Sequence, residues 1–567
     1  MRTLINLLLL LAFAPLHAQY HPSGQTTRST RFENVERVKY HSNGELKSRG
    51  YILNNNRDGE WTYYYDTGDL RRVENYKNGE KNGKWKYYNK NEELVRIENW
   101  SNGNPEGEWL YYSSDGQIKR IETFANGVAE GKWVVYNSNG DIYSTEFYIN
   151  GKKEGIFESF YSNGQTQTYG SYLKNRKDGK WMDYYINGQE KSVKIYAAEN
   201  KKGEWTEHYQ NGYLKSIGNF ENNLQEGEWV SYFDNGQIQT AGSYVNGEKD
   251  GKWVHYYYNG QVKSSGHFVE GKEDGQWLSY YEFGQKKSSI VYFDGKKDGE
   301  WIEYHFNGQL KSKGTYMYGS KEWDWEEYYD NGQIKGKAKF DRGKQVGAWI
   351  EYQYNGQEKT IGVYNEGKKE GSWKSYHKDG QLKSLGNYKM DRADGEWKTF
   401  FANKQLKARG RFNDGKKIGE WLFYYENGQL QSKGSFSFGF KSGEWKSYHK
   451  NGQLESSGEY SNGKKIGEWM FYHNNGKLQS TGEYQDGVKT GQWTNYHDNK
   501  QVLSAGKYYR GLKDGPWTFY YANGQIKSKG HYKYLLLMFK FSVKHGEWKS
   551  YKENGDLDEV KILDWIE

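Results

Sequence analysis

The sequence contains no cysteine and only 4 prolines among its 567 residues. Without cysteine, neither a disulfide nor a lipid anchor on a cysteine can form, so packing alone must hold the fold. Aliphatic residues are also scarce. Subtracting the 18% of aromatic residues from the 34% of hydrophobic residues leaves about 16% for Ala, Val, Ile, Leu and Met. This supply is too small for the several hydrophobic cores of a conventional multidomain enzyme of this length.

An excess of one charge sign is equally lacking. The 81 Lys and Arg exceed the 73 Asp and Glu by a formal +8, and the two signs are interspersed, as in NGEKDGKW at 246–253. This pattern predicts no nucleic-acid partner. The mean hydropathy of −1.13 is typical of disordered chains. However, disordered chains contain few aromatic residues, whereas this sequence has 54 Tyr, 24 Phe and 23 Trp. We therefore expect a repetitive, aromatic-rich fold.

A short apolar run follows the positively charged start of the chain. Residues 4–13 are apolar but for Asn6, and Ala18 offers a small residue for cleavage. The pattern predicts a secretory signal peptide at 1–18, and hence a secreted, periplasmic or cell-envelope protein of a bacterium. The run is shorter than the roughly 20 residues that span a bilayer as a helix. An N-terminal anchor or a buried strand is the alternative interpretation. Residues 19–36 form an N-terminal segment.

The rest of the chain is a repeat of 24 residues. Trp stands at 61, 85, 109 and 133 and at every twenty-fourth position from 181 to 517, and Phe157 fills the gap. Trp548 begins a last copy that is displaced by seven residues, and Arg37 keeps the phase at the other end. About 21 copies thus occupy 37–555. Because almost no residues remain for a catalytic domain, we expect no enzyme, no catalytic residues, no cofactor and no metal.

Each copy carries two short β-prone runs separated by turn signals. With Trp as position 0, the copy at 253–276 contains aromatic residues at +3 and +15, Asn-Gly at +6/+7 and Gly at −2. Position +15 is aromatic from Tyr76 to Tyr532, and position +3 departs only at His208. Asn-Gly punctuation between β-prone runs predicts hairpins. The predicted fold is therefore an all-β, elongated array of about 21 stacked hairpins that form a twisted antiparallel meander sheet.

Two registers are compatible with the first turn of the copy. A two-residue Asn-Gly turn places +4 opposite +9 and Trp opposite +13. A three-residue turn with left-handed Gly places +3 opposite +9 instead. We favour the second register, because +3 hardly varies whereas +4 changes to Asn89, Ser113, Gln353 and His377.

The repeat resembles a known family. Its signature G-x-[YF]-x-N-G-x-x-x-G-x-W-x-x-Y-x-x-N-G, as at 242–260, is similar to the MORN repeat. The ordinary MORN unit has Gly in place of Trp and is one residue shorter, so the chain resembles the bacterial variant typified by the YwqK-type antitoxin family. The resemblance covers roughly 90% of the chain. It implies stacked hairpins and a non-enzymatic scaffold or interaction role. Some relatives are labelled antitoxins and others have been proposed to bind lipids.

Histidines and acids at fixed positions are the candidates for chemistry. Five histidines take position +4, where other copies have Tyr or Phe: His305, His377, His449, His473 and His497. Neighbouring copies lie about 10 Å apart, whereas Zn–N bonds measure ~2.0 Å, so these histidines cannot share one ion. We interpret them as amphipathic substitutes for Tyr. The Asp or Glu that recurs before Gly-x-Trp is interpreted as a solvated turn residue.

The aromatic ladder has two interpretations. It packs the sheet, or it stacks on sugar rings or lipid surfaces of the envelope. The near-constancy of +3 and +15 favours packing, since a ligand site is usually confined to a subset of copies. Positions +1, +2, +12 and +14 vary most and are the better candidates for a partner footprint.

Two irregularities divide the array. The first four full copies, in the block at 37–150, carry Glu at +13 (Glu74, Glu98, Glu122 and Glu146), whereas most copies in the block at 151–533 carry Gly there. The C-terminal part at 534–567 contains an apolar insertion at 534–543, which we expect to form an extra terminal strand. Residues 560–566 are expected to add a cap, because an exposed sheet end invites pairing with another copy.

These observations predict a non-enzymatic, extracytoplasmic β-repeat scaffold that mediates protein–protein interaction. Envelope carbohydrate or lipid binding through the aromatic ladder is the first alternative. An antitoxin or immunity role, implied by the resemblance alone, is the second. The predicted partners are a protein of unknown identity, the envelope surface, and a second copy at the sheet ends.

Overall fold

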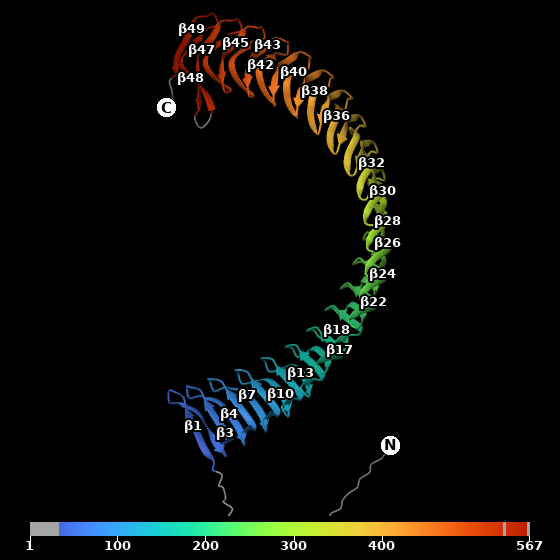
Figure 1. The fold of residues 1–567 in the computed structure, drawn as a ribbon, viewed down its shortest axis with the longest axis vertical. Coiled ribbons are helices and arrows are strands. Elements are labelled where there is room, and N and C mark those ends of the chain that lie inside the picture. Colours follow the sequence, from blue (N-terminus) through green and yellow to red (C-terminus); the bar gives the residue numbers. More distant parts are fainter. Residues whose placement is uncertain (1–32, 537–539, 564–567) are drawn as a thin grey trace, which may run out of the picture. The chain divides into compact units, whose positions relative to one another are not determined.

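The computed structural model describes residues 33–536 and 540–563. The predicted signal peptide at 1–18 and most of the segment at 19–36 lie outside the described residues. Every regular element of the described residues is a β-strand, and no helix among them could cross a membrane. The strands pair antiparallel with their neighbours in the chain (Figure 1), which confirms the predicted meander of stacked hairpins.

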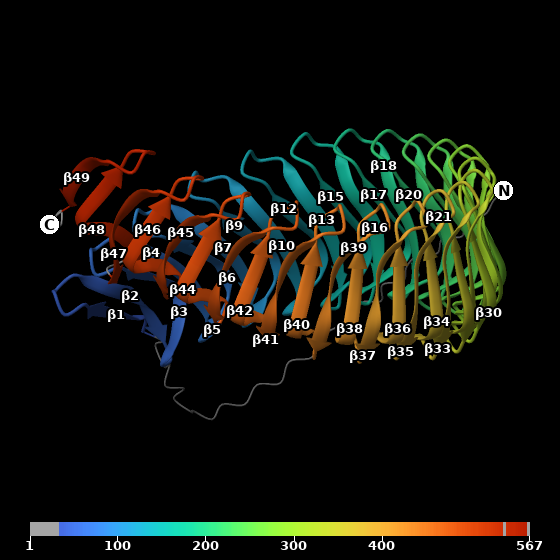
Figure 2. The same cartoon turned by 90° about the horizontal axis from the view of Figure 1, so that it is seen from above.

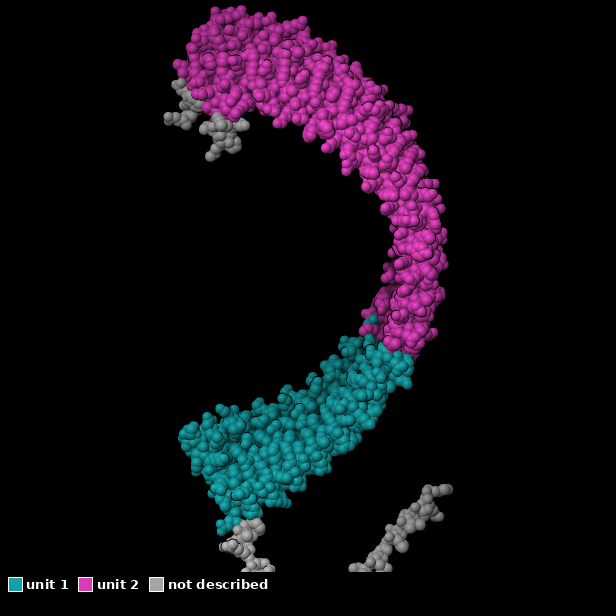
Figure 3. Space-filling view, in the orientation of Figure 1, with its two compact units in different colours: residues 1–214, 220–223 teal, residues 215–219, 224–567 magenta. Residues whose placement is uncertain are grey.

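The chain divides into two compact units (Figure 3). Unit 1 comprises residues 1–214 and 220–223, and unit 2 comprises residues 215–219 and 224–567. The division falls inside strand β21 (Leu214–Glu221).

In unit 1 several strands are broken into a short and a longer piece, whereas β3 and β17 run unbroken. The strands of this unit are β1 (Val35–Tyr40), β2 (Leu46–Leu53), β3 (Asn56–Tyr64), β4 (Leu70–Lys77), β5 (Glu80–Lys81), β6 (Gly83–Tyr88), β7 (Leu94–Ser101), β8 (Asn104–Pro105), β9 (Gly107–Tyr112), β10 (Ile118–Ala125), β11 (Val128–Ala129), β12 (Gly131–Tyr136), β13 (Ile142–Ile149), β14 (Lys152–Lys153), β15 (Gly155–Phe160), β16 (Thr166–Leu173), β17 (Arg176–Tyr184), β18 (Glu190–Ala197), β19 (Asn200–Lys201) and β20 (Gly203–His208).

Unit 2 is more regular, and Figure 2 shows its strands side by side with turns at both ends. The strands are β22 (Leu224–Tyr232), β23 (Ile238–Val245), β24 (Glu248–Tyr256), β25 (Val262–Val269), β26 (Lys272–Tyr280), β27 (Lys286–Phe293), β28 (Lys296–Tyr304), β29 (Leu310–Met317), β30 (Ser320–Tyr328), β31 (Ile334–Asp341), β32 (Lys344–Tyr352), β33 (Glu358–Asn365), β34 (Lys368–Tyr376), β35 (Leu382–Lys389), β36 (Arg392–Phe400), β37 (Leu406–Asn413), β38 (Lys416–Tyr424), β39 (Leu430–Ser437), β40 (Phe440–Tyr448), β41 (Leu454–Ser461), β42 (Lys464–Tyr472), β43 (Leu478–Gln485), β44 (Val488–Tyr496), β45 (Val502–Tyr509), β46 (Leu512–Tyr520), β47 (Ile526–Leu536), β48 (Lys540–Tyr551) and β49 (Leu557–Leu563).

The first turn of each copy has the favoured three-residue form. In the copy of Trp253, Tyr256 at +3 pairs with Val262 at +9. Tyr257 N donates to Gln261 O at 2.8 Å, and Gly260 at φ 83° completes the loop. A bulge follows, so Trp253 still faces Gly266 at +13. The prediction that +3 pairs with +9 is confirmed, and the bulge explains why the Trp pairing of the other register also occurs.

The second turn of most copies is a two-residue turn that usually ends in Gly, and in the copy of Trp229 it is Asn246-Gly247. Asn246 at φ 51° and Gly247 at φ 84° are both left-handed, as a type I′ hairpin requires. Gly247 N donates to Gln225 O at 2.9 Å, which joins this turn to the turn of the preceding copy. The Gly at −2 is also left-handed, with φ 72° at Gly251, because a bulge interrupts the pairing there.

The core is a row of Trp side chains with their aromatic neighbours. Trp253 is 3% exposed, and its Nε1 donates to Ser243 O at 3.0 Å. The ring of Tyr244, at +15 of the preceding copy, stands edge-on at 5.1 Å. A Cβ on Gly242, at +13, would overlap the indole of Trp253. The Gly at +13 is therefore required by the close approach of the next Trp.

The residue at +13 also decides whether the following strand is continuous. Strands are broken after Glu74, Glu98, Glu122, Glu146 and Lys194, where a charged side chain fills the space over which the next Trp would lie. After Gly170 and Gly242 the following strands β17 and β24 run unbroken. Ring pairs between +15 and the next Trp differ accordingly, with Trp100 and Trp109 tilted at 47° in unit 1 and Tyr460 and Trp469 edge-to-face at 88° in unit 2.

The apolar insertion at 534–543 does not form an extra strand, so that prediction was wrong. Its described residues instead lengthen β47 and β48, with Leu535 opposite Phe541. Because the insertion lies within a hairpin, extending both strands satisfies its backbone hydrogen bonds without a new partner. The predicted cap at 560–566 begins within β49, which pairs with β48 as the second strand of the last copy, and residues 564–567 lie outside the described residues.

Candidate functional site

The aromatic ladder is closed by lysines. Lys249, at −4, lies over the ring of Trp253 at 4.3 Å and over that of Phe268 at 5.0 Å. The same arrangement recurs from Lys81 to Lys544. In the copies that carry Lys at −4, the face of the Trp is thus covered by an ammonium group and flanked by rings, a geometry that stabilises both groups. Other copies carry Pro105, Ala129, Gln225, Glu273, Gln345 or Ala393 at this position. The buried tryptophans of the ladder thus pack the sheet.

The row of lysines is electrostatically strained in unit 2. Burial against the rings lowers the pKa of Lys441, and the neighbouring Lys417 lowers that pKa further. Burial likewise lowers the pKa of Lys489.

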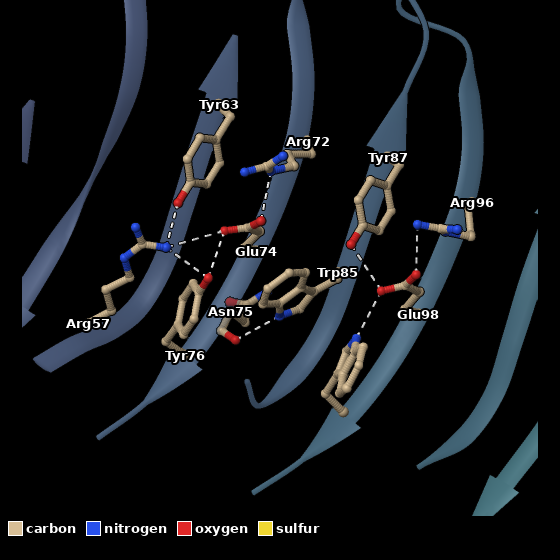
Figure 4. Close-up of polar contacts among 11 residues, drawn as sticks. Arg57, Tyr63, Arg72, Glu74, Asn75, Tyr76, Trp85, Tyr87, Arg96 and Glu98 are labelled. Atoms are coloured by element: carbon tan, nitrogen blue, oxygen red, sulfur yellow. Dashed lines mark hydrogen bonds and ion pairs between the residues drawn. The ribbon is translucent and has the colours of Figure 1, made fainter. Parts of the chain in front are cut away.

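Buried carboxylates stand at +13 in three copies of unit 1, at Glu74, Glu98 and Glu122, and Figure 4 shows the donors around Glu74 and Glu98. Glu98 is 3% exposed. It accepts hydrogen bonds from Tyr87 Oη at 3.0 Å and Trp100 Nε1 at 3.0 Å, and Arg96 Nη2 lies 2.8 Å away. The guanidinium of Arg96 also stacks on Tyr87 at 4.3 Å. Burial of a carboxylate is tolerated here because charge and hydrogen bonds are both supplied.

Glu74 begins this row with a second arginine. Arg72 Nε lies 2.7 Å from its carboxylate, and Tyr76 Oη donates to it at 2.9 Å. Arg57 Nη1 lies 3.7 Å from the same carboxylate and donates to the hydroxyls of Tyr63 and Tyr76 at 2.8 Å each (Figure 4).

These tyrosines resist ionisation. Burial and the carboxylate of Glu98 raise the pKa of Tyr87 to about 12. Burial and Glu74 raise the pKa of Tyr76 still further. A catalytic acid or base needs an oxygen that is free to meet a substrate. The donors already bound to Glu74 and Glu98 leave these carboxylates a structural role in holding the hairpins of unit 1 together.

The histidines at +4 make the hydrogen bond that tyrosines make elsewhere. Tyr425 Oη donates to Tyr448 O at 2.9 Å, and His449 Nε2 lies 2.9 Å from Tyr472 O in the next pair of copies. Because a carbonyl only accepts, Nε2 carries the proton. The interpretation of these histidines as substitutes for Tyr is confirmed. In the part of the chain that the structure describes, no three His, Asp or Glu side chains are grouped as metal ligands.

The sequence led us to expect solvated turn residues at the acids before Gly-x-Trp, but the structure gives them hydrogen-bond partners. Glu226 Oε2 accepts a hydrogen bond from Asn246 N at 2.9 Å, in the second turn of the following copy. Glu106 and Asp178 bond the amides of Asn126 and Ala198 in the same way. The recurring acid therefore links successive turns, a role that depends on an inter-copy contact the sequence does not display.

The positions predicted to carry a partner footprint are only partly free. Ser279 at +2 shares a hydrogen bond of 2.6 Å with Ser288 at +11, which places both in the packed face. Val254 at +1 and Ser265 at +12 pair across the hairpin and are half-exposed. The largest exposed apolar side chains lie instead in and beside the turns.

One copy in unit 2 departs from all others next to its second turn. Trp323 stands at −2, where the other copies have Gly, and it adopts φ 54°. A bulky residue with this backbone conformation is strained. Its side chain is 53% exposed, unlike the buried Trp325 two residues later. Trp325 Nε1 donates to Glu322 O at 3.2 Å instead of to the +14 carbonyl that most other copies use, as Trp253 does.

Further exposed apolar residues lie in the turn that precedes the strand of this tryptophan and at the end of β27. Tyr318 occupies the turn between β29 and β30 and is 67% exposed, and Met317 precedes it at 42%. Phe293 ends β27 at 62% exposure, and Gly319 N in the Tyr318 turn donates to Lys297 O of the preceding copy. We refer to Phe293, Met317, Tyr318 and Trp323 as the exposed turn patch.

Fold and geometry define the class of protein. It is a β-hairpin repeat array that is packed by an aromatic and lysine ladder. A sequence model of the MORN repeat variant family matches sixteen stretches that together cover more than half of the chain. The protein therefore belongs to this family. The matched residues are 57–78, 105–126, 129–150, 153–174, 225–246, 249–270, 273–294, 297–317, 324–342, 369–390, 393–414, 417–437, 441–462, 465–486, 513–534 and 544–560.

Other comparisons add little about function. No curated protein matches the chain. Among solved structures, the crystal structure of TcdB2-TccC3-TEV is 11% identical over 92% of this chain and 30% of that chain, with a TM-score of 0.12. The Tc holotoxin pore of Photorhabdus luminescens is 10% identical over 92% of this chain and 33% of that chain, also at 0.12. The chain thus spans about a third of these structures. The family match concerns the repeat, so the YwqK-type antitoxin role stays a prediction.

Proposed function

We propose that the protein is a non-enzymatic scaffold outside the cytoplasm that binds a protein partner through the exposed turn patch of unit 2. Exposed Trp and Tyr side chains grouped with Phe and Met are typical of the central contacts of protein interfaces. Charged groups beside the patch, such as the ion pair of Lys272 and Asp294 at 2.5 Å, supply a polar rim. The location outside the cytoplasm rests on the predicted signal peptide at 1–18.

The observation that carries this proposal is the strained backbone of Trp323. Glycine at −2 fits the left-handed bulge without strain in the other copies, whereas Trp323 costs stability there. A residue that opposes the stability of its own repeat, and that exposes its ring to solvent, is better explained by a contact outside the chain. The buried tryptophans of the ladder, by contrast, are explained by packing alone.

The variant W323G separates the two roles of this position. If Trp323 serves only the fold, restoring Gly leaves binding unchanged. If it is a partner contact, W323G folds at least as stably yet binds about tenfold or more weakly, as loss of an interface tryptophan does. Tyr318→Ser is the second test. Phe438→Ser is its matched control, because Phe438 occupies the same +17 position in another copy and is 74% exposed.

The partner is first identified by crosslinking and mass spectrometry on the native cell envelope, and the variants are then compared with that purified partner. Crosslinks at 317–323 and a loss of affinity in W323G and Tyr318→Ser, but not in Phe438→Ser, support the proposal. Unchanged affinity in W323G overturns it. Retention of the protein on isolated cell wall or on liposomes, with no protein crosslinked, favours the envelope-binding alternative instead.

A further inference from the structure

We propose that molecules of this protein join head to tail, with β49 of one molecule pairing antiparallel with β1 of the next molecule. β1 is the first strand of unit 1 and β49 is the last strand of unit 2 (Figure 1). Among the described residues, β1 pairs only with β2 and β49 only with β48. Each therefore presents one row of unpaired backbone donors and acceptors, which is a template for another strand.

The two edges match in phase. Each repeat has a first strand, which contains position 0, and a second strand, which follows the first turn. β1 spans positions −2 to +3 and is a first strand, whereas β49 spans +9 to +15 and is a second strand. Within each unit, every second strand is followed by a first strand of the next copy. A β49–β1 pair between two molecules would continue the same alternation, so no new geometry is required. A pairing of two β1 edges or two β49 edges would break it.

An internal strand pair fixes the expected register. In unit 1, β18 carries Lys194 at +13, and Ser192 at +11 pairs with Glu207 at +2 while Val193 pairs with Thr206. β49 likewise carries a lysine at +13, Lys561. The same register places Val560 of one molecule opposite Val38 of the next molecule, and Glu559 opposite Lys39.

Side chains at these positions favour the match. The Val38 side chain is 39% exposed and the Val560 side chain is 43% exposed, so pairing the two would bury apolar surface that now faces water. Where +11 and +2 meet inside the chain, their side chains touch, as Thr168 Oγ1 donates to Asp183 Oδ1 at 3.0 Å. Glu559 would therefore reach Lys39. Within one molecule, Lys561 Nζ lies 2.8 Å from the carboxylate of Glu559. Arg37 of the next molecule would lie beside the same carboxylate, which would then be shared among three cations.

Charge disfavours one of the competing arrangements. An antiparallel pair of two β1 strands centred on Val38 would oppose Arg37 to Lys39, and like charges directly opposite destabilise a sheet. The first turn adds one more contact to the head-to-tail arrangement. Asn523 Nδ2 donates to Glu553 O of the following copy at 3.0 Å, and Asn554 holds the same position before the first turn of the next molecule.

Such a contact is heterologous, because two different edges meet, and it would generate open or closed chains of molecules. The test uses the absence of cysteine in the sequence. Full-length V38C and V560C proteins are purified separately, mixed, and treated with a short thiol-specific crosslinker. The expected product is a covalent dimer in the mixture, with far less in either protein alone.

A charge exchange gives an independent readout in sedimentation experiments over a range of concentrations. K39E should shift self-association to about fivefold higher concentration, the effect of one exposed ion pair, and mixing K39E with E559K should restore it. Lys374→Glu, at an exposed position inside unit 2, is the matched control and should change nothing. Circular dichroism verifies that each variant keeps its β structure. Crosslinks only between two V560C chains, or a monomer at every concentration, would overturn the proposal.

Discussion

Gly242 lies directly beneath the indole of Trp253, so close that a Cβ at position 242 would overlap the ring. The two residues come from successive copies of the repeat, and the same contact recurs wherever +13 is Gly, from Gly50 and Trp61 to Gly530 and Trp548. The smallest and the largest residues of the repeat are therefore complementary parts of one contact.

Gly242→Ala is expected to destabilise its two copies by about 1–3 kcal/mol, because the added methyl group overpacks the buried ring. Hydrogen exchange measured along the chain should show the loss in β23 and β24 before distant strands, since each copy contacts only its neighbours. Gly336→Ala is the control. A Cβ there meets only Ile350 O at 3.5 Å and Trp349 at 3.9 Å. Equal effects of the two substitutions would refute this account.

His449→Tyr should leave stability nearly unchanged, because the hydroxyl can replace Nε2 as the donor to Tyr472 O. His449→Phe keeps a ring but removes that donor, and the unsatisfied carbonyl should cost about 1 kcal/mol. Thermal unfolding of the three proteins measures the difference. If Phe and Tyr prove equivalent, the hydrogen bond contributes nothing and only ring packing matters.

Alkaline pH should destabilise unit 1 in a defined window. The pKa of Tyr87 rises to about 12 in the folded protein, whereas an unfolded tyrosine ionises near 10. The folded state therefore holds this proton more tightly, so the stabilising contribution is complete below pH about 10 and is lost as the pH rises towards about 12. Tyrosinate absorbance followed together with circular dichroism checks this. Tyr87→Phe should weaken the dependence, and an unchanged profile in that variant would contradict the assignment to Tyr87.

Acid should act on a different group, Glu326 in unit 2. A hydrogen bond of 2.6 Å from Tyr328 and the ammonium of Lys313 lower its pKa to about 2 from 4.5. The stabilising contribution is thus present above pH 4.5 and is lost as the pH falls towards 2. Glu326→Gln should flatten the acid limb of the stability curve for unit 2, measured by hydrogen exchange in β29–β31. Glu300→Gln, at an exposed carboxylate, should leave the curve as it is.

The sequence by itself determined the repeat, the hairpins, the three-residue first turn and the role of the histidines. Each of these follows from local chemistry: Asn-Gly selects the turn, and a side chain that recurs every 24 residues marks a position that every copy needs. The absence of aliphatic core material is explained in the same way, since Trp, Tyr and Lys side chains from adjacent copies cover one another.

Only the tertiary structure decided what contacts between copies require. It showed why +13 is Gly, why a charged residue there breaks the next strand, and which amides the recurring acids bind. It also showed that the insertion at 534–543 lengthens a hairpin, and that Trp323 is strained and exposed while Trp325 is buried. These facts depend on which atoms of neighbouring copies approach one another, and a pattern along one chain does not contain those distances.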